Sequence, residues 1–180
     1  MAPVFWYTTP SLGGYGFPPS LISTFLIATG TLQAMWTLFL FPSLQRRLGS
    51  ATVLKMVTVV FPVFYGLTPG TVWTLRHHQT TLFWVSTSIL QVAYSFAGIS
   101  TVAIQLAISD VSPGPEVLGT LNSLALATVS GIRAIVPALF GTIYATTVEM
   151  QLLDGYLVWV ILTVLSLLLV VKVCLLPPLN

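Results

Sequence analysis

Five apolar segments, each about as long as a bilayer is thick, constrain this chain more than any other feature. A helix needs about 20 apolar residues to cross the hydrocarbon core of a membrane. The segments cover residues 20–41, 51–67, 80–109, 117–146 and 153–176. Because lipid offers no partner to unpaired backbone groups, each segment is predicted to cross as an α-helix. The predicted fold class is all-α: a polytopic membrane protein with five transmembrane helices.

The composition supports the same conclusion. Hydrophobic residues make up 56% of the chain and charged residues 6%, whereas about 25% of the residues of a soluble domain are charged. The expected partner is therefore the lipid bilayer. A formal net charge of +2 is too small to indicate nucleic acid. Cys174 is the single cysteine, which excludes an intrachain disulfide and a cysteine-based metal site.

The basic residues near the helix ends predict the orientation. If the five spans alternate in direction, one side of the membrane receives Arg46, Arg47, Lys55 and Lys172, and the other receives Arg76. Lysine and arginine accumulate on the cytoplasmic side. The N-terminus is therefore expected outside and the C-terminus in the cytoplasm. The pattern fits a plasma membrane and a vacuolar membrane equally well.

Arg133 lies near the middle of the fourth apolar segment, where a charge costs several kcal/mol. On a helix, Asn122, Arg133 and Tyr144 recur every eleven residues, which shifts them by only about 20° per step. They form one polar stripe, which suits a helix that borders a cavity. The alternative interpretation is an arginine that snorkels or binds the carbonyl groups of neighbouring helices.

The polar residues are shared unevenly among the spans. The first carries Gln33 and Trp36. The third carries four residues close to one helical line: Gln91, Ser95, Gly98 and Gln105. The second and fifth are almost wholly apolar at membrane depth. We therefore predict that the first, third and fourth spans line a central path, with the other two as peripheral supports.

The residues that catalysis or cofactor binding would need are missing from the predicted spans. The four carboxylates lie in or beside the connecting loops: Asp110, Glu116, Glu149 and Asp154. No paired-carboxylate acid/base site is formed. His77 and His78 are adjacent, so their side chains diverge and do not share a metal. Residues 13–16 are glycine-rich but lack the lysine of a phosphate-binding loop. Neither an enzyme nor a cofactor is predicted.

Residues 42–49 resemble a cytoplasmic loop motif of the major facilitator superfamily. Leu44, Arg47 and Gly49 match the degenerate repeat, between helices eight and nine, of the Gly-x-Leu-Ala-Asp-Arg-x-Gly signature. Pro42 stands in place of its first glycine and Arg46 in place of its aspartate. Residues 13–20 are similar to the glycine-rich outer loop of fungal members. Residues 119–122 and 130–139 resemble their eleventh helix.

The resemblance implies that the five spans correspond to helices eight to twelve of such a transporter, with the end of helix seven at residues 1–10. It implies a fold of two six-helix bundles around a central substrate path. Helices one to six, and the carboxylates that often couple proton movement to transport, have no counterpart in these 180 residues. The expectation is a secondary active transporter of small molecules, present as a C-terminal half that does not transport alone. An N-terminal bundle or a second copy would then be its partner.

A second reading belongs to another class of protein. A chain with five spans of one bundle can be a membrane interaction protein that does not transport, or a non-functional fragment. The polar faces at Gln33, Gln91 and Gln105 would then meet another protein rather than a substrate. Neither reading predicts uptake by the purified chain in liposomes.

Overall fold

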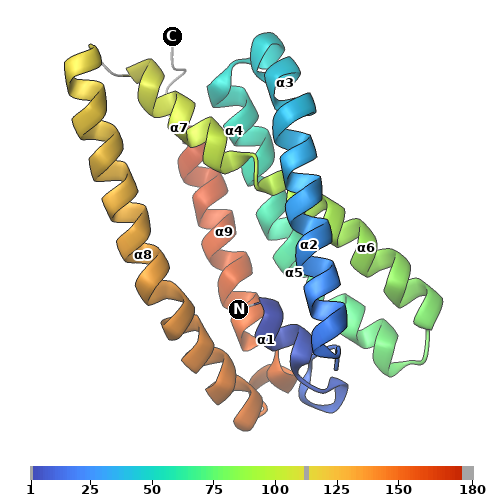
Figure 1. Ribbon diagram of the computed structural model, residues 1–180. Helices are drawn as coiled ribbons and strands as arrows, with labels where there is room; N and C mark the ends of the chain where they lie inside the picture. Colours follow the sequence, from blue (N-terminus) through green and yellow to red (C-terminus); the bar gives the residue numbers. More distant parts are fainter. Residues whose placement is uncertain (1, 112–113, 176–180) are drawn as a thin grey trace.

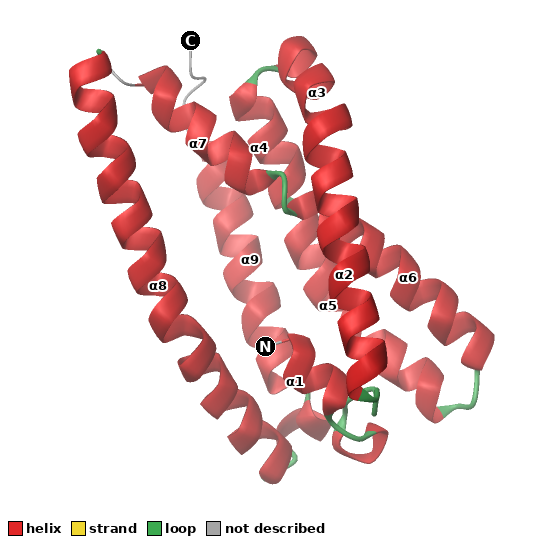
Figure 2. Ribbon diagram, in the orientation of Figure 1, coloured by secondary structure: helices red, strands yellow, loops and turns green. Residues whose placement is uncertain are grey.

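The computed structural model describes residues 2–111 and 114–175 of the chain. Within these two ranges the regular structure is helical, without strands (Figure 2). Five helical segments are long and apolar enough to cross a membrane. They cover Pro19–Leu48, Ser50–Arg76, Thr80–Ser109, Glu116–Glu149 and Leu157–Leu175. The all-α polytopic fold predicted from the sequence is confirmed.

The first span continues past Pro42, where the sequence predicted its end. Helix α2 (Pro19–Met35) passes through a π-helical turn, η2 (Trp36–Leu40), into α3 (Phe41–Leu48). Pro42 occupies the first turn of α3, where a residue without an N–H is tolerated. The π turn just before it absorbs the change in backbone hydrogen bonding, so the helix extends through the basic pair Arg46 and Arg47.

The second span consists of two helices that meet at Val59. They are α4 (Ser50–Thr58) and α5 (Val60–Arg76). The junction lies three residues before Pro62, whose ring clashes with the carbonyl group four residues earlier in a regular helix. The kink expected from Pro62 therefore appears one turn before it. The span ends at Arg76 rather than at Leu67, because Pro69 is accommodated inside α5.

The third span is interrupted near its middle. Helix α6 (Thr80–Ala97) ends at Gly98, and α7 (Ser100–Val111) follows Ile99. The amide of Gly98 donates to the carbonyl of Ser95 at 3.2 Å, and that of Ile99 to Phe96 at 3.1 Å. These bonds reach back three residues, which tightens the turn relative to an α-helix. The predicted bounds of the span, residues 80–109, are confirmed, but the single helical line predicted through Gln91, Ser95, Gly98 and Gln105 is broken at this point.

The fourth span is one long helix, and the fifth begins later than predicted. Helix α8 (Pro115–Glu149) follows Gly114 and carries Glu116 in its first turn, which confirms the predicted start. Helix α9 (Leu157–Leu175) follows a turn, η3 (Leu152–Gly155). Leu153 and Asp154 adopt left-handed φ angles of 52° and 55° and cannot continue a helix, so the predicted start at residue 153 is wrong. The predicted stop at residues 177–178 lies outside the described residues.

The N-terminal segment folds against the bundle rather than lying free at its surface. It contains a short helix, α1 (Ala2–Tyr7), and a 3-10 turn, η1 (Pro10–Leu12). Phe5 and Trp6 are buried, and the Phe5 ring packs edge-on against Trp159 with centroids 4.6 Å apart. Two amides of the following loop donate to α1 carbonyls, including Phe17 to Trp6 at 2.7 Å. This segment closes one end of the bundle (Figure 1).

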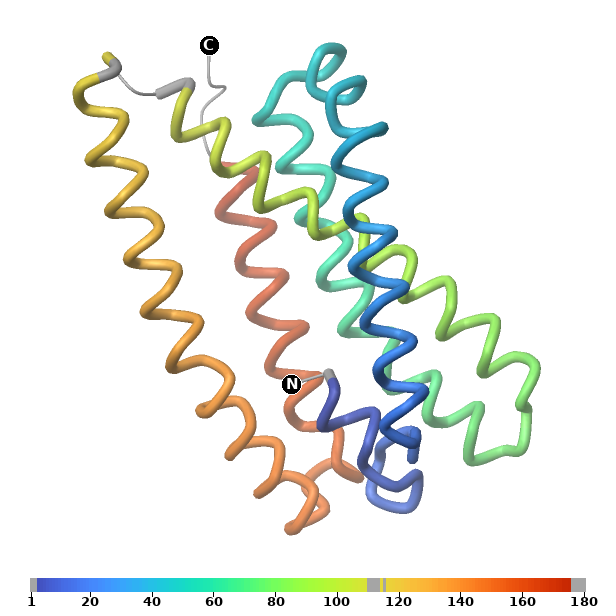
Figure 3. Tube along the Cα trace, in the orientation of Figure 1, coloured from blue at the N-terminus to red at the C-terminus, as the bar shows by residue number. Residues whose placement is uncertain are grey.

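Helix α5 is the centre of the packing, and α8 stands to one side. Helix α5 contacts both α6 and α9, and α4 contacts α7 and α9. The second span, expected at the periphery, thus packs against both the third and the fifth span. Helix α8 touches η3, α9 and α7, but the most apolar part of its span contains no buried residue. Figure 3 shows it as a separate rod along one flank.

The connections lie at two opposite ends of the molecule. The α3–α4 joint and the C-terminal end of α9 share one end, while α1, η3 and the turn between α5 and α6 share the other (Figure 1). Arg46 and Arg47 belong to the first end and Arg76 to the second. The basic residues are therefore distributed between the two ends as the alternating topology requires.

Candidate functional site

Arg133 lies in the middle of α8 and is exposed. It forms no ion pair or hydrogen bond with any residue that the structure describes. Four residues later, Pro137 lies inside the same helix. Since proline has no N–H, the carbonyl group of Arg133 lacks its usual intrahelical donor. The middle of this apolar helix thus carries an unpaired guanidinium and, beside it, a freed carbonyl oxygen.

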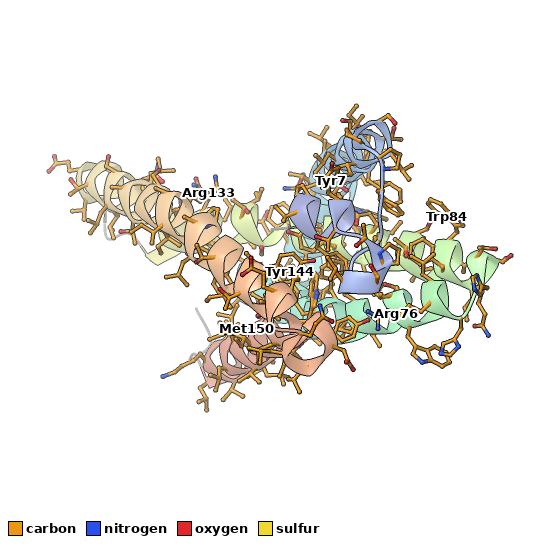
Figure 4. All side chains as sticks on the ribbon, turned by 90° about the horizontal axis from the view of Figure 1, so that it is seen from below. Tyr7, Arg76, Trp84, Arg133, Tyr144 and Met150 are labelled. Carbon is orange, nitrogen blue, oxygen red and sulfur yellow. The ribbon has the colours of Figure 1, made fainter. Side chains whose placement is uncertain are left out.

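The predicted polar stripe divides into two parts. Asn122 and Arg133 are exposed, as a surface facing water or another protein requires. Tyr144 is only 3% exposed, and its ring lies edge-on to Phe5 with centroids 6.4 Å apart. Figure 4 shows Tyr144 near the closed end of the bundle and Arg133 farther along α8. Tyr144 therefore anchors α8 to the N-terminal segment.

Four of the other predicted residues meet between the first and third spans. The indole Nε1 of Trp36 donates to Ser95 Oγ at 3.0 Å, and the amide nitrogen of Gln91 donates to Thr29 Oγ1. Ser95 in turn donates to the carbonyl of Val92 at 2.7 Å. Gln91 and Ser95 are 7% and 1% exposed. We call this group, with Gln33, the α2–α6 seam.

Gln33 contributes to the α2–α6 seam by packing its side chain against a glycine. Its side chain lies directly over Gly98, where any added Cβ atom would collide with it. Thr29 was not singled out from the sequence, whereas Gly98 was placed on one helical line with Gln91. The spacing of Thr29, Gln33 and Trp36 by four and three residues was the signal for Thr29, because such residues share a helix face. The role of Gly98 has no such signal, since it depends on a contact between distant segments.

Gln105 does not join this group. It lies on α7, beyond the interruption at Gly98, and is exposed. The tighter turn at Gly98 and Ile99 changes the register, so the sequence pattern that aligned Gln105 with Gln91 does not hold in three dimensions. The structure therefore separates Gln105 from the seam.

The loop motif forms a compact joint between α3 and α4. Gly49 alone links the two helices, with φ 77°, a left-handed value that glycine adopts without strain. Leu44 packs against a buried cluster that includes Phe41 and Val53. Arg47 is exposed. The leucine and the glycine of the motif thus shape the joint, while the arginine is free to interact with solvent or headgroups.

Arg76 holds the opposite end together. Its Nε donates to the carbonyl of Pro10 at 3.0 Å, and its Nη2 to that of Ser11 at 3.4 Å. The guanidinium also lies 5.8 Å from the ring centroid of Tyr156, within cation–π range. One basic side chain therefore connects η1, α5 and the start of α9.

The residues with acid–base side chains are spread around the ends of the helices. Glu116, Glu149 and Asp154 are exposed, as are His77 and His78 in the turn after α5. No group of three histidine, cysteine, aspartate or glutamate residues suited to a metal occurs among the described residues. The side chain of Asp110 lies outside the description.

Comparison with known proteins gives two informative relatives. The chain is 38% identical over 162 residues to the efflux pump azaK of Aspergillus niger, a match that covers 90% of this chain and 35% of the relative. The chain is a homologue of fungal major facilitator superfamily transporters. It is also 29% identical over 137 residues to the major facilitator superfamily multidrug transporter mfsB of Aspergillus fumigatus, covering 76% of this chain and 22% of that protein. No family model matches the chain, and no solved structure matches it.

The helical structure agrees with homology to these transporters. The five apolar helices and the relatives together establish an integral, multi-pass membrane protein. The chain spans about a third or less of the length of either transporter. The resemblance drawn from residues 42–49 and from the Arg133 helix therefore identified the right superfamily.

Proposed function

We propose that this chain forms one side of the substrate path of a secondary active transporter that exports small organic molecules. One observation carries the proposal: Arg133 is an unpaired, exposed guanidinium in the middle of an apolar spanning helix. A guanidinium stays charged at any relevant pH. Its cost in a membrane must therefore be met by water in a cavity, by an acidic partner or by an anionic group of the substrate.

The names of the relatives support export as the direction of transport. One is named an efflux pump and the other a multidrug transporter, so export of organic compounds is the activity we assign. Alternating access moves two repeats or bundles against each other around a site at their interface. Helix α8, with no buried residue in the apolar part of its span, offers the face on which a second bundle would close.

In this proposal the α2–α6 seam has a structural role. Its hydrogen bonds join the first and third spans at membrane depth, so two walls of the path keep a fixed spacing. Gln33 and Trp36 are half-buried and remain partly available to a substrate. Gln105 and Asn122, both exposed, would border the path nearer its cytoplasmic end.

The test is transport by a complete transporter that carries this bundle. Arg133→Ala is expected to reduce substrate export at least tenfold while insertion and expression stay near wild type. Arg133→Lys should restore only part of the activity, because a point charge does not reproduce the planar fork of donors. The matched control is Thr128→Ala on the same helix, which removes an exposed hydroxyl bonded only to the carbonyl of Leu124. Wild-type export by Arg133→Ala would refute the proposal.

The competing class is a membrane interaction protein that does not transport. The apolar residues exposed on α8, including Leu124, Ile132 and Ile135, suit contact with lipid tails as well as with another protein, so they do not separate the two classes. Liposomes containing the purified 180-residue chain should show no gradient-dependent uptake above empty liposomes. If they do take up substrate, two copies of this chain suffice for transport. If the complete transporter is also inactive with every compound tried, the interaction reading replaces ours.

A further inference from the structure

A cavity of about 220 Å³ lies between α5, α6, α8 and α9. Its walls are mainly aromatic, and they come from four helices: Phe64, Tyr65, Tyr94, Pro137, Phe140 and Trp159. None of the residues predicted to line the path contributes to it. We propose that this cavity binds a planar, mostly apolar molecule of one or two fused rings that carries a hydrogen-bonding oxygen. This inference rests on the proposed transport function and names the class of its substrate.

The volume of the cavity limits the number of rings that the ligand can have. An apolar cavity of about 150 Å³ in a protein binds benzene. The cavity described here is larger, at about 220 Å³, so it has room for a second fused ring. Val136, which also lines it, is 40% exposed, so one side is open for entry.

The arrangement of the rings favours a flat ligand. Phe64 and Tyr94 lie with centroids 4.6 Å apart, and Tyr65 lies 6.3 Å from Trp159. Aromatic rings at such separations attract one another in offset or edge-on geometry. Phe140 brings a further ring from α8. A planar ring system lying against these ring pairs would make the same favourable contacts, whereas a flexible chain would lose conformational entropy without them.

Hydrogen-bonding groups without a partner at the cavity predict that the ligand carries an oxygen atom. The hydroxyl groups of Tyr65 and Tyr94 have no hydrogen-bond partner within the described ranges. The Nε1 of Trp159 is buried and likewise lacks a partner there. The carbonyl of Arg133, freed by Pro137, adds an acceptor on α8. Unpaired polar groups at membrane depth are costly, and a ligand oxygen relieves that cost.

The cavity also adjoins Arg133. Pro137 and Phe140 follow Arg133 by four and seven residues, within about 40° of it around the helix and about 6 and 10 Å along its axis. A ring bound in the cavity therefore lies on the face of α8 that we assign to the substrate path. Nothing in this arrangement requires the ligand to be charged.

The test is saturable binding of tritiated 1-naphthol to the 180-residue chain in lipid nanodiscs, with empty nanodiscs as background. Wild-type protein is expected to bind one molecule per chain, and naphthalene, which lacks the oxygen, to bind at least tenfold more weakly. Tyr94→Phe or Tyr65→Phe should weaken 1-naphthol binding three- to tenfold and leave naphthalene binding unchanged. The absence of saturable 1-naphthol binding, or equal affinity for the two compounds, overturns the inference.

A substitution that fills the cavity tests whether the ligand binds there. Val136→Phe should reduce 1-naphthol affinity at least tenfold, because the larger side chain occupies the cavity. Val129→Phe is the matched control: Val129 is 43% exposed on the same helix, does not line the cavity, and should stay within twofold of wild type. Equal binding by both variants places the ligand elsewhere and overturns the inference. Binding is measured without transport, so its outcome is independent of the Arg133 export experiment.

Discussion

At the scale of single residues, the closed end of the bundle depends on a backbone contact that only glycine permits. A Cβ atom on Gly14 would collide with the carbonyl oxygen of Thr8 and lie 2.6 Å from that of Phe5. Both obstacles are backbone atoms, so no side-chain rotation relieves them. Overpacking of this kind costs about 1–3 kcal/mol.

Gly14→Ala is therefore expected to destabilise the protein by about 1–3 kcal/mol, measured as a lower unfolding midpoint in detergent micelles. Gly30 provides the control because an added Cβ there meets nothing within 4 Å. Gly30→Ala lies inside α2 and should leave stability unchanged or raise it by up to about 1 kcal/mol. Equal midpoints for the two variants would contradict the predicted contact.

A second prediction at this scale concerns pH. Tyr15, in the loop before α2, donates or accepts a 2.5 Å hydrogen bond with Thr71. Burial raises the pKa of its phenol above the ordinary value of 10, although hydrogen bonds with Thr71 and Thr87 oppose the shift. The folded state thus retains the proton longer than the unfolded state. Its contribution to stability is complete below pH 10 and is lost as the pH rises through the raised pKa.

Unfolding midpoints measured from pH 8 to pH 12 should therefore fall more steeply for wild type than for Tyr15→Phe, which cannot ionise. Tyr156, outside the start of α9, has a pKa raised by burial and lowered in part by Arg76, so some alkaline sensitivity should remain in the variant. Superimposable pH profiles would show that Tyr15 is not buried as described.

At the scale of helices, the α2–α6 seam should couple its two spans energetically. Interhelical hydrogen bonds in membrane proteins contribute on average about 0.6 kcal/mol, with a maximum near 1.7. A double-mutant cycle with Trp36→Phe and Ser95→Ala is expected to give a coupling energy in this range, because the 3.0 Å bond joins these two side chains. A cycle of Trp36→Phe with Ser86→Ala is the control: Ser86 bonds only within its own helix. Additive effects of Trp36→Phe and Ser95→Ala would contradict the seam.

The helices were also the part of the structure that the sequence predicted best. The five spans follow from apolar length alone, and the start of α8 follows from Gly114, Pro115 and Glu116, because these signals are local. The passage of the first span through Pro42 and the interruption at Gly98 were missed. Both depend on how a π turn or a neighbouring glutamine fits the helix, which a one-dimensional pattern does not encode.

The sequence likewise revealed one part of the candidate site and not the other. Arg133 stands out in the sequence because a charge interrupts an apolar run. The aromatic cavity does not, because Phe64, Tyr94 and Trp159 come from three spans, and aromatic residues are common in any membrane helix. Tyr144 shared the periodicity of Arg133, yet contact with Phe5 removed it from the exposed face.

At the scale of the whole molecule, the arrangement of the ends predicts the topology. A glycosylation acceptor placed in the turn at residues 77–79, between α5 and α6, should be modified outside the cytoplasm. A tag after the last residue of the chain should be protected from external protease. The structure narrows the outer probe site to this turn, since the preceding residues up to Arg76 are helical. Reversed results for the two probes would overturn the predicted orientation.

The central claim is that Arg133 faces a water-accessible path rather than lipid, and cysteine accessibility tests it most directly. Cys174 is the single cysteine of these 180 residues. Cys174→Ser, together with replacement of every cysteine in the rest of a complete transporter that carries this bundle, gives a clean background. Arg133→Cys is compared with Ile132→Cys, its exposed neighbour on α8, whose side chain points about 100° away around the helix. A charged, membrane-impermeant thiol reagent is expected to label Arg133→Cys at least tenfold faster than Ile132→Cys, and added substrate is expected to slow the reaction. Equal or reversed labelling rates would show that Arg133 does not line the path.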